Sequence, residues 1–106
     1  MPKYLIQANY VGEGVKGLLK EGGTSRRANL DKVIKSLGGT MEAFYYAFGE
    51  TDVFVLADLP DNASMAGLAL TVAASGVVTL KTTVLMTPEE VDTATKKAPS
   101  YRAPGQ

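Results

Sequence analysis

Residues 40–60, "TMEAFYYAFGETDVFVLADLP", carry the pattern on which the fold prediction rests. Both halves of this stretch are rich in aromatic and aliphatic side chains, and residues 49–51, "GET", separate them. Two such runs joined by a short turn that contains glycine are typical of a β-hairpin. The stretch therefore predicts two adjacent antiparallel strands, residues 40–50 and 52–60.

Before the hairpin, the sequence predicts a strand and then a broken helix. Residues 3–10, "KYLIQANY", alternate in the manner of a β-strand. Residues 12–38 have a helical pattern that the glycine pair at 22–23 interrupts, and Thr24 or Ser25 is positioned to cap the second piece. A second glycine pair then ends this helix.

After the hairpin, the sequence predicts a helix, a strand and a short final helix. Residues 60–62, "PDN", open a helix that Gly76 closes, and residues 77–86 predict a fourth strand. Thr87 is positioned to cap the last helix, where Glu90 can complete a capping box.

In chain order these elements read β-α-β-β-α-β, with one further helix at the C-terminus. This order is typical of the ferredoxin-like or split β-α-β fold, an α+β class in which four antiparallel strands form one sheet. Right-handed crossovers put both helical segments on the same face of that sheet. A chain of 106 residues has the size of one domain, so residues 1–106 are interpreted as a single domain whose last residues, 98–106, form a flexible tail.

Both faces of the predicted sheet are apolar, although helices cover only one of them. Alternation assigns Phe44 and Tyr46 to one face of the second strand. It assigns Met41 and Tyr45 to the other face. An uncovered apolar face of this kind needs a partner. We expect a second copy of the chain, packed sheet to sheet in a homodimer or a larger even oligomer; the alternative is that the C-terminal helix folds back over the open face.

Polar side chains interrupt this apolar pattern at one place on the sheet. Gln7 and Asn9 of the first strand share a face with a polar group on the fourth strand, which is its neighbour in the predicted topology. That group consists of Thr79, Lys81 and Thr83. An amine among apolar neighbours needs hydrogen-bond partners or water. The polar residues therefore predict either a small polar cavity between two sheets or the wet rim of a subunit interface.

The composition excludes several kinds of chemistry. The chain has no cysteine and no histidine, which removes disulfides, thiolate nucleophiles, zinc–thiolate sites and the commonest general base and haem ligand. We therefore expect no metal and no cofactor. A formal net charge of zero gives no general attraction to nucleic acid or anionic membranes. No apolar run approaches the ~20 residues of a membrane span, and we expect a cytoplasmic protein.

Residues 10–17, "YVGEGVKG", contain the glycine spacing G-x-G-x-x-G of dinucleotide-binding loops. Such a loop also needs an acidic residue ~20 positions further on, at the end of a second parallel strand. The corresponding residues, 35–40, are "KSLGGT", and the predicted second strand is antiparallel to the first. We therefore interpret the match as fortuitous.

A second segment, residues 22–27 ("GGTSRR"), is a better candidate for binding an anion. Free N–H groups at a helix start, two hydroxyls, and the guanidinium groups of Arg26 and Arg27 could hold a phosphate or a carboxylate. Residues 12–38 are locally basic, with six Lys or Arg against three Asp or Glu. The alternative is a break between helices whose arginines are solvated or pair with a neighbouring subunit.

The turn motif "FGETD" at residues 48–52 is part of a wider resemblance. Together with "KYLIQANY", "EGVKGLLKEGGTSRR", "LGGTMEAFYYAFGETDVFVLADLPDNAS" and "TPEEVD", it resembles the GYD family of small bacterial and archaeal proteins over about residues 3–102. Gly49 and Asp52 match the Gly-Tyr-Asp turn that names the family, and Thr51 stands in place of its tyrosine. The resemblance implies a dimeric α/β barrel, in which two ferredoxin-like sheets pack face to face.

The resemblance implies no particular activity. Relatives in the wider group of dimeric barrels range from cofactor-free oxygenases and isomerases to haem enzymes and ligand-sensing domains. The turn itself also has a structural interpretation, because Gly49 can take a positive φ and Asp52 can accept N–H groups of the turn. A binding site at this turn is the alternative.

Two functions from different classes therefore stay open. The first is a non-catalytic homo-oligomeric module that binds a small polar or anionic ligand between subunits. The second is a cofactor-independent enzyme of oxygenase or isomerase type with an aromatic-lined cavity, and its acid–base groups would be Tyr45, Tyr46, Asp52 and Lys81. A structural assembly protein would need oligomerisation alone. No residue is assigned as catalytic, and the candidate ligand-binding residues are Gln7, Asn9, Arg26, Arg27, Tyr45, Tyr46, Asp52 and Lys81.

Overall fold

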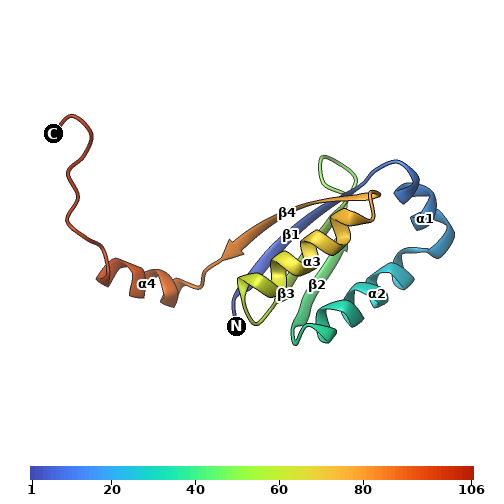
Figure 1. Cartoon of the computed structure of the whole chain (residues 1–106), viewed down its shortest axis with the longest axis horizontal. Helices are drawn as coiled ribbons and strands as arrows, with labels where there is room; N and C mark the ends of the chain where they lie inside the picture. The colour runs from blue at the N-terminus through green and yellow to red at the C-terminus, as the bar shows by residue number, and fades with distance from the viewer.

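Four antiparallel strands form one sheet with helices against one side of it, in an α+β fold (Figure 1). The computed structural model describes residues 1–106, and its elements are β1 (Lys3–Tyr10), α1 (Glu13–Glu21), α2 (Gly23–Ser36), β2 (Thr40–Tyr46), β3 (Val53–Asp58), α3 (Asn62–Ala74), β4 (Val78–Leu85) and α4 (Pro88–Lys96). The strands lie in the order β2-β3-β1-β4, and every neighbouring pair is antiparallel. The predicted order of elements and the pairing of the first strand with the fourth are therefore confirmed.

The hydrophobic core lies between the sheet and helices α2 and α3. β1 and β3 form the centre of the sheet, and alternate side chains of both strands are buried in this core. α2 packs against β2, and α3 packs against β4. The two buried residues of α3 are Met65 and Leu68. The core consists of Tyr4, Ile6, Ala8, Ile34, Val53, Val55, Ala57, Leu59, Met65 and Leu68.

A β-bulge in β2 changes which of its side chains face the core. Met41 and Ala43 lie opposite consecutive residues of β3, so one residue of β2 is extra in the ladder. Met41 consequently packs against the core. Its predicted position on the same face as Tyr45 is wrong, because simple alternation does not hold across the bulge.

The hairpin turn is longer than predicted. Residues 47–52 form a loop between β2 and β3, where the sequence predicts a turn of residues 49–51. The N–H of Ala47 donates to the carbonyl of Asp52 at 2.8 Å and closes this loop. The predicted strand ends at residues 50 and 52 are therefore wrong, because the ladder stops at this hydrogen bond.

A glycine with a positive φ separates α1 from α2. Gly22 has a φ of 85° and directly precedes α2, in a backbone conformation that favours glycine. No side chain caps α2, and Thr24 and Ser25 are exposed within its first turn. The predicted break is confirmed, whereas the prediction that Thr24 or Ser25 caps the second helix is wrong.

Two glycines near the start of α1 have structural roles. Gly12 has a φ of 53° in the turn after β1. Gly14 is buried, and a Cβ atom there would lie 2.2 Å from the carbonyl oxygen of Val77. The same oxygen accepts the N–H of Val11 at 2.9 Å. Backbone conformation and close packing against the start of β4 therefore account for the first two glycines of the G-x-G-x-x-G spacing.

α4 begins as predicted but lies apart from the rest of the molecule. The hydroxyl of Thr87 accepts the N–H of Glu90 at 3.1 Å, and the carboxylate of Glu90 accepts the N–H of Thr87 at 3.1 Å, which completes the predicted capping box. No residue of α4 is buried. We call α4 and residues 97–106 the C-terminal arm, which extends away from the sheet (Figure 1).

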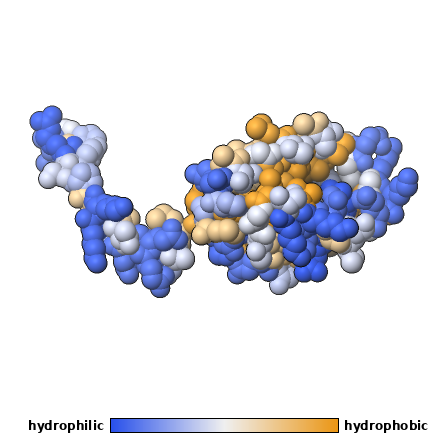
Figure 2. All heavy atoms as spheres, turned by 60° about the horizontal axis from the view of Figure 1, so that its bottom comes forward, coloured by the Kyte–Doolittle hydropathy of each residue, from blue (hydrophilic) through white to orange (hydrophobic).

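The C-terminal arm is mostly hydrophilic, whereas hydrophobic residues are concentrated on the body of the molecule (Figure 2). Because the arm extends away, the alternative in which the C-terminal helix folds back over the open sheet face is wrong. None of the helices combines the length and the apolar character needed to cross a membrane.

Candidate functional site

The face of the sheet opposite the helices is uncovered and carries apolar side chains from three strands. Leu5 of β1 pairs with Leu56 of β3, and Phe54 of β3 pairs with Tyr45 of β2. Tyr45 is 71% exposed, and the other three residues are half-buried. We call these four residues the apolar strip. They form the apolar surface that the sequence predicts for the open face.

At one end of the apolar strip, ion pairs connect the three strands β1, β2 and β3. The ammonium group of Lys3 pairs with the carboxylate of Glu42 and lies 3.1 Å from that of Asp58. The hydrogen bonds to Glu42 and then to Asp58 raise the pKa of Lys3. This amine thus already has two carboxylate partners within the chain.

At the other end lies a polar hollow of about 290 Å³, lined by Gln7, Asn9, Glu50, Thr51, Thr79, Leu80 and Lys81. The register of β1 against β4 brings Gln7 opposite Lys81 and Asn9 opposite Thr79. The loop after β2 supplies Glu50 and Thr51, which sequence reasoning did not assign to this group; their place in the turn motif was the available signal. We call this region the polar hollow.

Within the polar hollow, a hydrogen bond connects the loop of residues 47–52 to β1. The side-chain amide of Gln7 donates to the hydroxyl of Thr51 at 3.4 Å. Thr51 thus supplies a hydroxyl where the family motif has a tyrosine. The hollow contains one amine, Lys81, and one carboxylate, Glu50, together with amides and hydroxyls.

Asp52 fastens the same loop to the end of β1. Its carboxylate accepts the backbone N–H of Tyr10 at 3.0 Å. Its own N–H donates to the side-chain oxygen of Asn9 at 2.8 Å and to the carbonyl of Ala8 at 3.1 Å. The prediction that Asp52 accepts N–H groups of the turn is wrong, because its donor lies on β1. Gly49 does not adopt a positive φ either.

Tyr45 and Tyr46 lie on opposite faces of the sheet. The hydroxyl of Tyr46 donates to the carbonyl of Gly23 at 3.0 Å, on the helix-covered side. Its ring meets that of Phe44 edge to face, with centroids 5.0 Å apart. Burial, followed by the neighbouring phenol of Tyr10, raises the pKa of Tyr46 to about 12. Tyr46 therefore connects β2 to the start of α2 as a neutral hydrogen-bond donor.

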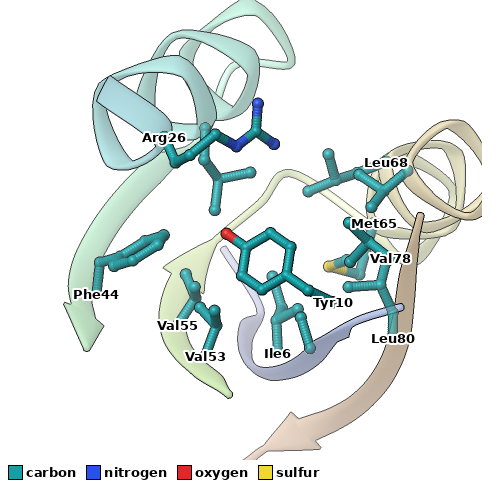
Figure 3. Close-up of a pocket in the computed structure, with 13 residues that line it drawn as sticks. Ile6, Tyr10, Arg26, Phe44, Val53, Val55, Met65, Leu68, Val78 and Leu80 are labelled. Atoms are coloured by element: carbon teal, nitrogen blue, oxygen red, sulfur yellow. The ribbon is translucent and has the colours of Figure 1, made fainter. Parts of the chain in front are cut away.

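A pocket of about 70 Å³ lies on the covered side, between the sheet, α2 and α3 (Figure 3). Arg26 is the only charged residue in its lining, which also includes the ring of Tyr10. Arg26 also forms an ion pair with Glu21 at 3.5 Å, whereas Arg27 is exposed. Sequence reasoning missed Tyr10, although its position in the alternation of β1 assigns it to this face.

The structure does not bring all the predicted site residues together. Gln7, Asn9 and Lys81 meet in the polar hollow, and Asp52 lies next to it in the loop attachment. Arg26 and Tyr46 lie across the sheet on the covered side. The four acid–base groups considered for an enzyme, Tyr45, Tyr46, Asp52 and Lys81, are thus divided between two faces.

These features define an α+β protein with one covered sheet face and one open face, each with its own polar groups. The chain belongs to the GYD family, because the model of the GYD domain matches residues 4–95. The predicted family is therefore confirmed, and the matched range includes both faces and nearly all of α4. Comparisons with curated proteins and with solved structures give no match.

Proposed function

We propose that this chain is a non-catalytic homo-oligomeric module in which two copies pair through their open sheet faces and hold a small polar or anionic ligand between them. The observation that carries this proposal is the position of the polar hollow beside the apolar strip on one uncovered face. The arrangement would be the dimeric α/β barrel that the family resemblance implies.

The apolar strip supports the pairing of two copies. Its four side chains adjoin across the middle strands of the sheet, and neither a helix nor the C-terminal arm covers them. A contiguous exposed apolar patch is typical of a protein interface. A second copy supplies an identical apolar strip, and two-fold pairing makes the same patch serve both partners.

The polar hollow supports a ligand between the copies. None of the ion pairs within the chain involves Lys81. Once a second sheet covers the hollow, an unpaired ammonium group there would be costly. A small ligand with an anionic group would pair with Lys81, and its other polar atoms would meet the amides of Gln7 and Asn9. The division of the candidate acid–base groups between two faces favours binding over the enzymatic alternative.

The pairing is tested by native mass spectrometry of the full chain and of Phe54→Glu. We expect a dimer or larger even oligomer for the natural sequence and a monomer for Phe54→Glu, because a carboxylate would be buried in the apolar strip. Leu70→Glu is the matched control, since Leu70 is 72% exposed on α3 and should leave the assembly intact. A natural chain that is monomeric at micromolar concentration would refute the pairing.

The ligand is tested with glycolate, which carries both a carboxylate and a hydroxyl. We expect glycolate to shift the side-chain amide NMR signals of Gln7 and Asn9. Lys81→Gln should abolish these shifts, and Lys96→Gln on the C-terminal arm should preserve them. The contrary result is a dimer in which Lys81→Gln binds glycolate, and a series of other small hydroxy acids and amino acids, as well as the natural sequence does. That result would exclude the proposed site and leave a structural assembly role.

A further inference from the structure

We propose that the covered side of the sheet carries a second binding site, a pocket for a short branched aliphatic monocarboxylate whose carboxylate pairs with Arg26. This site shares no residue with the apolar strip, and Leu80 is its one lining residue in common with the polar hollow. It does not require a dimer, and it therefore stands independently of the proposed function.

The pocket exists because α2 and α3 pack near opposite edges of the sheet. α2 contacts β2 and α3 contacts β4, so the central strands β1 and β3 face the space between the helices. Ile6, Val55 and Leu68 are among the walls of the pocket (Figure 3). A water molecule needs a cavity of only about 10–15 Å³, whereas this pocket has about 70 Å³. It has room for a small branched alkyl group.

The pocket can be reached from solvent. A wider groove of about 360 Å³ runs between α1, α2 and α3. The groove and the pocket have six lining residues in common: Tyr10, Arg26, Leu30, Leu68, Val72 and Val78. A ligand entering along the groove would therefore pass Arg26 before its alkyl group reached the sheet.

Arg26 supplies the charge that selects an anion. It is the only charged residue of the pocket, and its side chain is 34% exposed. Its one ion-pair partner within the chain is Glu21, with a single contact of 3.5 Å. A guanidinium group has five N–H donors and binds a carboxylate best through two parallel hydrogen bonds. The contact with Glu21 leaves donors free for a second carboxylate.

Tyr10 adds a hydroxyl next to this charge. Its ring stands in the pocket with the oxygen on the side of Arg26 (Figure 3). The backbone of Tyr10 is held by the carboxylate of Asp52 at 3.0 Å. The phenol, which also neighbours Tyr46, would be a second donor to the oxygen of a carboxylate bound by Arg26.

The outer groove limits the ligand to one negative charge. Glu13 and Glu21 both line it, outside the apolar pocket. A second carboxylate at the far end of a ligand would meet these like charges. A monocarboxylate with an apolar end should therefore bind better than a dicarboxylate of similar length.

The test is an NMR titration of the full-length protein with isovalerate, followed through the methyl signals of Val55 and Leu68. We expect saturable shifts that Arg26→Gln weakens at least tenfold. Arg27→Gln is the matched control and should leave the affinity unchanged. Glu21→Gln should strengthen binding several-fold, because it releases Arg26 from its ion pair. If the ion pair had only a structural role, Arg26→Gln and Glu21→Gln would change the affinity for isovalerate in the same direction.

Three results would overturn the proposal: no methyl shifts with isovalerate, equal affinity for its neutral amide, or equal affinity for glutarate. Val72→Phe gives a second check, since a larger ring at this lining position should fill the entrance and prevent binding. Phe54→Glu and Lys81→Gln should bind isovalerate like the natural chain. A failure of the dimer or of glycolate binding is thus separable from a failure of this site.

Discussion

The carboxylate of Asp52 replaces a backbone partner at the end of β1. β1 continues to Tyr10 in its pairing with β4, but its pairing with β3 ends at Ala8. The N–H of Tyr10 would therefore lack a strand partner on the β3 side, and Asp52 accepts it at 3.0 Å. The aspartate of the family turn thus has a structural role in this chain, as the attachment of the loop to the sheet.

Replacing Asp52 tests this role. Asp52→Ala leaves the partly buried N–H of Tyr10 without an acceptor, so we expect the free energy of unfolding to fall by about 2 kcal/mol. Glu50→Ala, two residues away in the same loop, should change it by less than about 0.5 kcal/mol. Urea denaturation measures both. Equal effects of the two substitutions would contradict the attachment.

Tyr46 should make the free energy of unfolding depend on pH in the alkaline range. Burial raises the pKa of Tyr46 to about 12, above the value of about 10 in an unfolded chain. Its contribution to stability is therefore complete below pH ~10 and is lost as the pH rises through the folded pKa. Tyr46→Phe lacks this loss and also lacks the hydrogen bond to Gly23, which should cost about 1 kcal/mol at neutral pH.

The measurement for Tyr46 is the difference in unfolding free energy between the natural chain and Tyr46→Phe at pH 7 and at increasing pH above 10. We expect this difference to narrow at high pH. Tyr4 also has a raised pKa because of burial, but it is present in both proteins and cancels in the comparison. A difference that stays constant with pH would contradict the assignment.

At the level of the elements, the glycines of α1 position this helix rather than a nucleotide. A Cβ at Gly14 would lie 2.2 Å from a backbone oxygen of Val77, whereas a Cβ at Gly17 would meet no atom within 4 Å. We expect Gly14→Ala to lower the free energy of unfolding by about 2 kcal/mol, because the backbone must shift. Gly17→Ala should raise it by up to about 1 kcal/mol, because alanine is the better helix former.

Thermal and urea unfolding of Gly14→Ala and Gly17→Ala measure these two changes in stability. The same exchange of glycine for alanine should have opposite signs at positions three residues apart. Two neutral substitutions would mean that the start of α1 is free to move away from β4.

Most elements could be predicted from the sequence because their signals are local. The helix of residues 62–74 has its cap at Asp61, and the last helix has a complete capping box. The bulge at Met41 could not be predicted, because neither a glycine nor a proline marks it. The turn was predicted at residues 49–51 rather than 47–52 because Phe48 continues the apolar pattern, yet its side chain is fully exposed.

The polar hollow and the pocket at Arg26 differ in how much of each could be predicted from the sequence. The polar hollow was partly predictable, because alternation and the pairing of β1 with β4 align Gln7 with Lys81. Glu50 joins it only through the path of a loop. The pocket at Arg26 depends on the separation of α2 and α3 and on which way one side chain turns, and neither is a local property of the sequence.

Across the whole molecule, α4 should behave differently from α3. Both helices have a side-chain cap, but α3 packs on the sheet and no residue of α4 is buried. Thr87→Ala should therefore melt α4 while changing the global free energy of unfolding by less than about 0.5 kcal/mol, although loss of a cap in a packed helix usually costs about 1 kcal/mol.

Asp61→Ala is the comparison for Thr87→Ala. The carboxylate of Asp61 accepts the N–H of Ser64 at 2.8 Å at the start of α3. Its loss should lower the urea midpoint of the whole protein. Amide hydrogen exchange should report faster exchange only in residues 88–96 for Thr87→Ala. Equal changes in the midpoint for both variants would mean that α4 is part of the cooperative unit.

The extended C-terminal arm also affects how the molecule moves through solvent. A compact chain of this length would have a radius of gyration of about 13 Å, whereas the observed value is 17.0 Å and the longest dimension is 57 Å. A single copy would therefore experience more friction than its mass suggests and would elute early from a sizing column. Stoichiometry inferred from elution alone would count a monomer as something larger, so subunits must be counted by mass.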